Sequence, residues 1–202
     1  MKNCIRTAVF SVSHFMMDFM CHYYAFFLIK SLMPDKVLII YILYNFIAFA
    51  LQCPIGAFCD RFEPKKTVSV SFVILILGFC LGFILFPDNA VVVVAGLMIC
   101  AVANAVCHSG GYAAVSTKGS EGLINGGVFI SFGALGVGLG DYLGNNGIFV
   151  AWWALIAALL VVVLVNLPII RSEKETVSGH DIEDRTEIVL LILCLAAVFA
   201  RS

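Results

Sequence analysis

Three ionisable residues near the start of the chain have the spacing of one helical face. His14, Asp18 and His22 are four residues apart, so their side chains point in nearly the same direction on a helix of 3.6 residues per turn. A carboxylate in the middle of an apolar helix costs roughly 2.5–3.5 kcal/mol on membrane-insertion scales and therefore faces protein or water. Histidine pairs with carboxylates and titrates near neutral pH. The pattern predicts a proton-binding or cation-binding group at Asp18. The alternative is a buried polar cluster that fixes helix packing.

Two other apolar stretches carry polar residues of the same kind. Asn104 and His108 are again four residues apart, and Ser109-Gly110-Gly111 follows them; Asn45 lies in an earlier stretch. We expect these residues to line one cavity with the three on the first helix. Because the spacing offers no metal-ligand pattern beyond pairs four residues apart, we predict no metal and no cofactor.

The composition is that of an integral membrane protein. Of the 202 residues, 62% are hydrophobic and 12% are charged, whereas soluble domains are about half apolar and about a quarter charged. Stretches of about 20 apolar residues cross a bilayer and predict six helices, at 7–30, 37–58, 67–86, 90–112, 123–144 and 147–170. We expect an all-α bundle over residues 1–170, a charged cytoplasmic linker over 171–186, and a truncated seventh helix from 187 to 202.

The polarity of the six predicted helices follows an order that occurs twice. The first and fourth helices carry the histidines, the second and fifth carry Asn45 and Asp141, and the third and sixth are almost entirely apolar. Polar groups at membrane depth face protein or water, and helices that are apolar all round face lipid. The order therefore predicts an inverted three-plus-three repeat, with the third and sixth helices outside.

The connection between the second and third helices, GAFCDRFEPKKT, is short and charged. It contains Gly56, Asp60, Arg61, Lys65 and Lys66. If the N-terminus is cytoplasmic, nine lysines and arginines fall inside, whereas two, in the connection after the first helix, fall outside. Positive residues concentrate on the cytoplasmic side of membrane proteins. We therefore expect a cytoplasmic N-terminus and a cytoplasmic loop.

The fifth predicted helix is rich in glycine. Gly136, Gly140 and Gly144 are four residues apart, and Gly133 precedes them. Small residues at this spacing let two membrane helices approach closely. We expect these four glycines to form a helix-packing stripe.

Three of these stretches resemble one family, the major facilitator superfamily. The loop is similar to its signature G-x-x-x-D-R-x-G-R-R/K, with Glu63 and Pro64 at the second glycine and first basic position. The run GGVFISFGALGVGLGDYLG is similar to the glycine-rich motif of proton antiporters, which usually ends Gly-Pro; here Asp141 follows Gly140. The pairs His14/Asp18 and Asn104/His108 are similar to the H-F-x-x-D and N-A-x-x-H segments of the fosmidomycin-resistance-like branch.

The resemblance implies a proton-coupled secondary transporter of the cell (inner) membrane. It would export a small solute or drug by antiport and alternating access, driven by the proton gradient, with the Asp60-Arg61 loop as a cytoplasmic gate. The family normally has twelve helices in two bundles, so the implied partner is a second six-helix bundle, either another copy or a C-terminal half. No nucleic-acid partner is expected.

Two other functions remain open at the level of the sequence. One is a non-transporting membrane subunit that assembles with a partner bundle. The other is a membrane enzyme or haem protein that uses His14, His22 and His108, which we disfavour because no metal-ligand spacing supports it. We therefore expect a transporter and not an enzyme.

Overall fold

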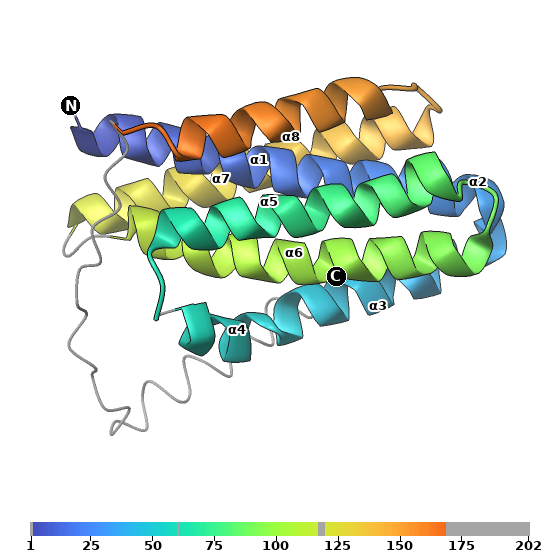
Figure 1. Cartoon of the computed structure of the whole chain (residues 1–202), viewed down its shortest axis with the longest axis horizontal. Helices are drawn as coiled ribbons and strands as arrows, with labels where there is room; N and C mark the ends of the chain where they lie inside the picture. Colours follow the sequence, from blue (N-terminus) through green and yellow to red (C-terminus); the bar gives the residue numbers. More distant parts are fainter. Residues whose placement is uncertain (1, 60, 117–119, 169–202) are drawn as a thin grey trace.

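The computed structural model describes residues 2–59, 61–116 and 120–168. Asp60, the predicted linker at 171–186 and the helix predicted from 187 to 202 lie outside the described residues. Within them, the chain is all-helical and contains no strand (Figure 1). The prediction of an all-α membrane protein is confirmed.

The helices form six consecutive segments. They are α1 (Lys2–Tyr24) with η1 (Ala25–Ile29) and α2 (Lys30–Leu32); η2 (Pro34–Lys36) with α3 (Val37–Ala50) and α4 (Gln52–Cys59); α5 (Pro64–Cys80) with η3 (Leu81–Leu85); α6 (Ala90–Val115); α7 (Ser120–Asn145); and α8 (Ala151–Val165).

Local sequence explains where several segments begin or break. Pro54 lacks a backbone N–H, and the second segment is interrupted at Leu51, between α3 and α4. Pro64 occupies the first turn of α5, where a missing N–H is tolerated. The side chain of Asn89 accepts a hydrogen bond from the backbone N–H of Val92 at 3.2 Å and caps α6.

The sixth segment is shorter than its sequence predicted. The prediction was 147–170, but α8 begins at Ala151 and ends at Val165. Gly147 has a φ of 65° and forms a turn after α7, and the residues up to Val150 are not helical. After Val165, Pro168 disfavours a helical conformation in the residue before it.

Among the described residues, four helices are long and apolar enough to cross a membrane by length and composition. They span Pro34–Phe58, Pro64–Leu85, Ala90–Val115 and Gly122–Asn145. The helix Ala151–Val165 is apolar but has 15 residues, about 22 Å at 1.5 Å per residue. The first segment, Lys2–Leu32, is long enough but carries the polar residues of the predicted site. The protein is a multi-pass membrane protein.

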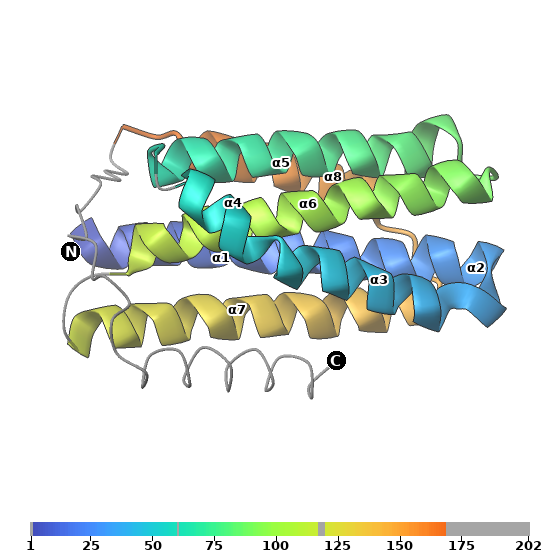
Figure 2. The same cartoon turned by 90° about the horizontal axis from the view of Figure 1, so that it is seen from below.

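Two of the six described segments form a central pair, and two others pack together beside it. The first and fourth segments, α1 and α6, pack against each other in the centre. The third and sixth, α5 and α8, contact each other on one side of this pair, as Figure 2 shows. The second and fifth flank the pair elsewhere, with α3 and α4 against α6, and α7 against α1. This is a six-segment half-bundle.

The interior is close-packed around the aromatic residues of α1. Tyr24 is fully buried, and its hydroxyl donates a hydrogen bond to the carbonyl of Val93 at 2.8 Å. A Cβ at Gly82 or Gly96 would collide with the Tyr24 hydroxyl. The two glycines therefore provide the space in which α1 packs against η3 and α6.

Candidate functional site

Polar residues of α1 and α6 converge near the middle of both helices. His14 Nε2 lies 3.1 Å from Asp18 Oδ2, and His108 Nε2 lies 3.2 Å from Asp18 Oδ1. Asn104 Nδ2 donates a hydrogen bond to Asp18 Oδ1 at 2.8 Å. The Nε2 atoms of the two histidines are 2.9 Å apart. We call these four residues, His14, Asp18, Asn104 and His108, the Asp18 cluster.

The contact made by His14 Nδ1 shows which of the two ring nitrogens carries a proton. His14 Nδ1 lies 2.8 Å from the carbonyl oxygen of Phe129. A carbonyl oxygen accepts hydrogen bonds and does not donate them, so Nδ1 carries the proton. In a neutral imidazole, Nε2 then carries no proton and has a free lone pair. This lone pair faces a carboxylate oxygen of Asp18.

The cluster therefore contains a position for a cation. A proton on His108 Nε2 can be donated to Asp18 Oδ1, 3.2 Å away. It leaves two lone pairs, on His14 Nε2 and Asp18 Oδ2, facing each other at 3.1 Å. A proton or another cation between them removes this repulsion.

The cluster is buried but accessible from one side. His14, Asp18 and Asn104 are buried, whereas the side chain of His108 is 20% exposed. The ring of Phe129 stacks on His14 with centroids 4.2 Å apart and covers it from α7. Access to Asp18 therefore passes His108.

A tyrosine from α3 joins the cluster. Asn104 Nδ2 also donates to the hydroxyl oxygen of Tyr44 at 2.9 Å. Tyr44 is 1% exposed, so its hydroxyl depends on protein partners for hydrogen bonding. This contact ties the second segment to the centre of the bundle.

A second polar cluster lies further along α1. His22 Nδ1 is 2.8 Å from Asp141 Oδ1 of α7, and the Tyr41 hydroxyl of α3 lies 3.2 Å from the same nitrogen. His22 is buried, and the side chain of Asp141 is 35% exposed. We call His22, Tyr41 and Asp141 the His22 cluster. It links α1, α3 and α7.

The two clusters divide the predicted cavity residues between them. Four of the six, His14, Asp18, Asn104 and His108, meet in the Asp18 cluster. His22 contacts Asp141 and Tyr41 instead of Asp18. Asn45 donates to the carbonyl of Tyr41 in its own helix, at 3.1 Å, and no contact between Asn45 and Asp18 is seen among the described residues.

The charged loop is described in part. Arg61 is exposed, and its backbone N–H donates to the carbonyl of Phe58 at 3.2 Å. Lys66 forms an exposed ion pair with Glu63 at 3.3 Å, whereas Lys65 is half-buried. Gly56 lies near Ser109 of α6. Asp60 lies outside the described residues.

The four glycines of the predicted stripe lie on the face of α7 that packs on α1. A Cβ at Gly133 would collide with His14, and one at Gly136 with the Phe15 carbonyl. A Cβ at Gly140 would lie 2.6 Å from the carbonyl oxygen of Phe19, and one at Gly144 would lie 3.0 Å from Phe26 Cβ. The stripe lets α7 approach the backbone of α1.

Four residues in or beside the two clusters were missing from the predicted site. They are Tyr41 and Tyr44, which lie one helical turn apart, Phe129, and Asp141. Asp141 gave a usable signal, because a carboxylate within an apolar helix requires a partner. The sequence contains no signal that distinguishes the two tyrosines and Phe129 from ordinary aromatic residues of the core.

The Asp18 cluster also has the composition of a metal-binding group. The ligating atoms of His14, Asp18 and His108 all lie within 4.8 Å of one another. The sequence predicted that these three residues line one cavity, but their spacing did not predict a metal site, because the third ligand comes from another helix, 90 residues away.

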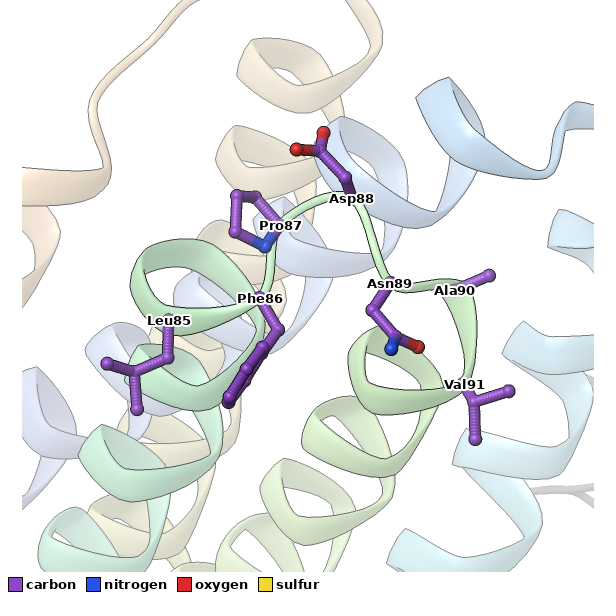
Figure 3. A pocket seen from close by; sticks show the side chains of 7 residues that line it. All are labelled: Leu85, Phe86, Pro87, Asp88, Asn89, Ala90 and Val91. Carbon is purple, nitrogen blue, oxygen red and sulfur yellow. The ribbon is translucent and has the colours of Figure 1, made fainter.

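A shallow depression at the turn between η3 and α6 lies away from the Asp18 cluster. Leu85, Phe86, Pro87, Asp88, Asn89, Ala90 and Val91 line it, and Figure 3 shows their side chains spread around the turn instead of converging on one point. Asn104 lies 13 residues beyond Val91 on α6, about 20 Å away at 1.5 Å per residue.

Comparison with known proteins gives one match. The family model described as Major Facilitator Superfamily matches residues 8–200, a range that includes both clusters and the charged loop. No curated protein and no solved structure matches the chain.

Proposed function

The chain belongs to the major facilitator superfamily, and we propose that it is a proton-coupled secondary transporter that exports a small solute or drug by alternating access. The observation that carries this proposal is the Asp18 cluster. A buried carboxylate with two imidazoles around it has no structural necessity in an apolar bundle, and such groups mark ion pathways in membrane proteins.

The proposed coupling step is the gain and loss of one cation by the cluster. With a proton between His14 and Asp18, the negative charge of the carboxylate is balanced, and the site is compatible with a low-dielectric surrounding. Without it, the carboxylate requires water or solute on the side of His108. The state with the cation is therefore compatible with a closed site, and the state without it favours a site open to water or solute. Coupling by alternating access requires such a difference.

The transport path is proposed to lie between this bundle and a second one. His108, Asn45 and Asp141 are all partly exposed, and polar groups at membrane depth face protein or water. A second six-helix bundle, from another copy or from a C-terminal half, would enclose them. We propose that Asn45 contacts the solute on this path.

Orientation and gating are part of the same proposal. The excess of lysine and arginine on one side supports a cytoplasmic N-terminus in the inner membrane. The loop that contains Arg61, Lys65 and Lys66 would then be a cytoplasmic gate, in which charge-assisted pairs form and break as the bundles move. The H-F-x-x-D and N-A-x-x-H segments support placement in the fosmidomycin-resistance-like branch, with fosmidomycin as a first test solute.

The test is solute-dependent proton movement. The protein, purified with any subunit that accompanies it, is reconstituted into vesicles that contain a pH-sensitive dye, and fosmidomycin and other small drugs are added under an imposed pH gradient. We expect a solute to accelerate loss of the gradient with the wild type and with Asp88→Asn, the same substitution in an exposed loop, but not with Asp18→Asn. Equal proton movement with Asp18→Asn would refute the role of Asp18.

The second candidate function, a non-transporting subunit, makes a different prediction for the same preparation. The partly exposed polar groups of α6 and α7 would also be enclosed by a partner that does not transport. In that case a second subunit would be present at a fixed stoichiometry, and none of the solutes would move protons.

A further inference from the structure

Ligating atoms of three residues of the Asp18 cluster lie close enough together to surround one small metal ion. His14 Nε2 and His108 Nε2 are 2.9 Å apart, Asp18 Oδ2 lies 3.1 Å from His14 Nε2, and Asp18 Oδ1 lies 3.2 Å from His108 Nε2. Zinc binds nitrogen and oxygen at about 2.0–2.2 Å in a tetrahedron, which places its ligands about 3.3 Å from one another. The two contacts of Asp18 use different oxygens, so the carboxylate would bind one ion with both oxygens or turn to present one of them. With one oxygen as the ligand, the three ligating atoms lie within 4.8 Å of one another.

The groups behind the ligands also match those of a metal site. Metal-binding histidines usually donate the second ring N–H to a carbonyl or carboxylate, which fixes the tautomer. His14 Nδ1 makes such a contact, 2.8 Å from the Phe129 carbonyl. Asn104 Nδ2 donates to Asp18 Oδ1 at 2.8 Å and fixes the carboxylate. Two ligands therefore have hydrogen-bonded supports before any metal arrives.

We propose that His14, Asp18 and His108 bind a divalent transition-metal ion of the zinc class. Two imidazoles and one carboxylate suit Zn²⁺ and its first-row neighbours, whereas Ca²⁺ and Mg²⁺ prefer oxygen ligands throughout. This inference rests on the proposed function, because it gives the same transport site a second cation. The metal would occupy the position between His14 and Asp18 that a proton otherwise fills.

The fourth coordination position is open on the accessible side. Three protein ligands leave one position of a tetrahedron for water or solute, and the 20% exposure of His108 places it toward the partly open side of the bundle. A divalent ion with one carboxylate leaves a net positive charge at membrane depth, which is unfavourable. The site therefore favours an anionic fourth ligand, such as hydroxide or an acidic group of a solute.

The His22 cluster provides an internal comparison. It contains one histidine and one carboxylate at 2.8 Å, with a tyrosine in place of a second imidazole. Neutral tyrosine is a poor ligand for zinc, so this cluster lacks the third ligand. His22→Gln is thus a matched control, since it removes a histidine from the same helix but outside the proposed site.

The experiment measures binding of Zn²⁺ and Co²⁺ to the purified protein, carried on an affinity tag without histidine. Co²⁺ in a tetrahedral site gives strong visible absorption, and titration of Zn²⁺ against it gives the zinc affinity. We expect one equivalent per chain for the wild type and for His22→Gln. His108→Gln keeps an amide near the position of Nε2 but loses the ligand. Because loss of a supporting group alone costs 10–100-fold, we expect its affinity to fall by about 100-fold or more.

Two further measurements separate a lost ligand from a misfolded protein. Zn²⁺ should raise the melting temperature of the wild type and of His22→Gln, but not that of His108→Gln, whose melting temperature without metal should stay near that of the wild type. Asn104→Ala, which keeps all three ligands, should weaken binding by about 10–100-fold. The Co²⁺ complex of Asn104→Ala should keep the absorption spectrum of a tetrahedral site.

The metal proposal and the transport proposal fail in different ways. Absence of zinc binding by the wild type, or equal loss of binding in His22→Gln and His108→Gln, would overturn the metal site. Neither result would affect proton movement that depends on Asp18. Conversely, zinc binding in a protein that moves no protons with any solute would leave the metal site standing and remove proton coupling.

Discussion

Replacement of Gly140 by alanine should weaken the packing of α7 on α1. The added Cβ would lie 2.6 Å from the carbonyl oxygen of Phe19, 3.0 Å from the backbone nitrogen of Tyr23 and 3.0 Å from His22 Cβ. Ordinary contacts of a Cβ begin at 3.4 Å. The first neighbour is backbone and cannot rotate away, so the two helices must separate by about 0.8 Å, the difference between these distances.

The expected change in free energy has two parts of opposite sign. Overpacking of a close interface costs about 1–3 kcal/mol. Replacement of glycine by alanine within a helix stabilises it by about 1 kcal/mol. Gly138→Ala, in the same helix, measures the gain in helix propensity alone, because a Cβ there meets nothing within 4 Å. Gly140→Ala should therefore be less stable than Gly138→Ala by about 1–3 kcal/mol.

The assay is unfolding of the purified protein by titration with sodium dodecyl sulfate, followed by circular dichroism. Both variants carry the same substitution in the same helix, so differences in helix propensity and in side-chain chemistry cancel. If Gly140→Ala were as stable as Gly138→Ala, α7 would not pack against the backbone of α1. The position of Phe129 over His14 would then lose its physical basis.

Three other substitutions test individual contacts. Gly133→Ala would press on the His14 ring, which can rotate, so we expect it to weaken zinc binding and proton coupling more than 10-fold with a smaller loss of stability than Gly140→Ala. Tyr24→Phe removes the 2.8 Å hydrogen bond to Val93 and should lower the free energy of unfolding by about 0.5–1.5 kcal/mol in the same detergent titration. Tyr44→Phe removes an acceptor of the Asn104 amide. The melting temperature should fall, and the Co²⁺ absorption of the Asp18 cluster should remain.

The pairing within the Asp18 cluster was predictable in kind from the sequence. Two pairs of polar residues four apart, on helices otherwise apolar, can be stabilised by facing each other. The order of polarity along the chain predicted that the third and sixth helices lie outside them. These patterns did not determine the distances between the side chains of α1 and α6, because the separation of the two helices depends on packing and not on residue spacing.

The separation of His22 from Asp18 shows a second limit. His14 and His22 are each four residues from Asp18, about 6 Å along the helix at 1.5 Å per residue. His14 contacts Asp18, whereas His22 contacts Asp141. A shared face therefore did not imply a shared site. The neighbours of each residue come from α3 and α7, whose positions along α1 were not available from periodicity.

The register between α1 and α7 explains why Asp141 could not be assigned its partner in advance. The side-chain direction on α7 turns by about 100° for each residue, so a contact displaced by one residue would point Asp141 away from His22. The register is set where Gly136, Gly140 and Gly144 admit the backbone of α1. A glycine stripe predicts that a helix will approach closely, but the opposite surface decides which residues it meets. Asp141, next to Gly140, is thus brought to His22 by the packing of its neighbour, and its own requirement for a partner is satisfied in the same step.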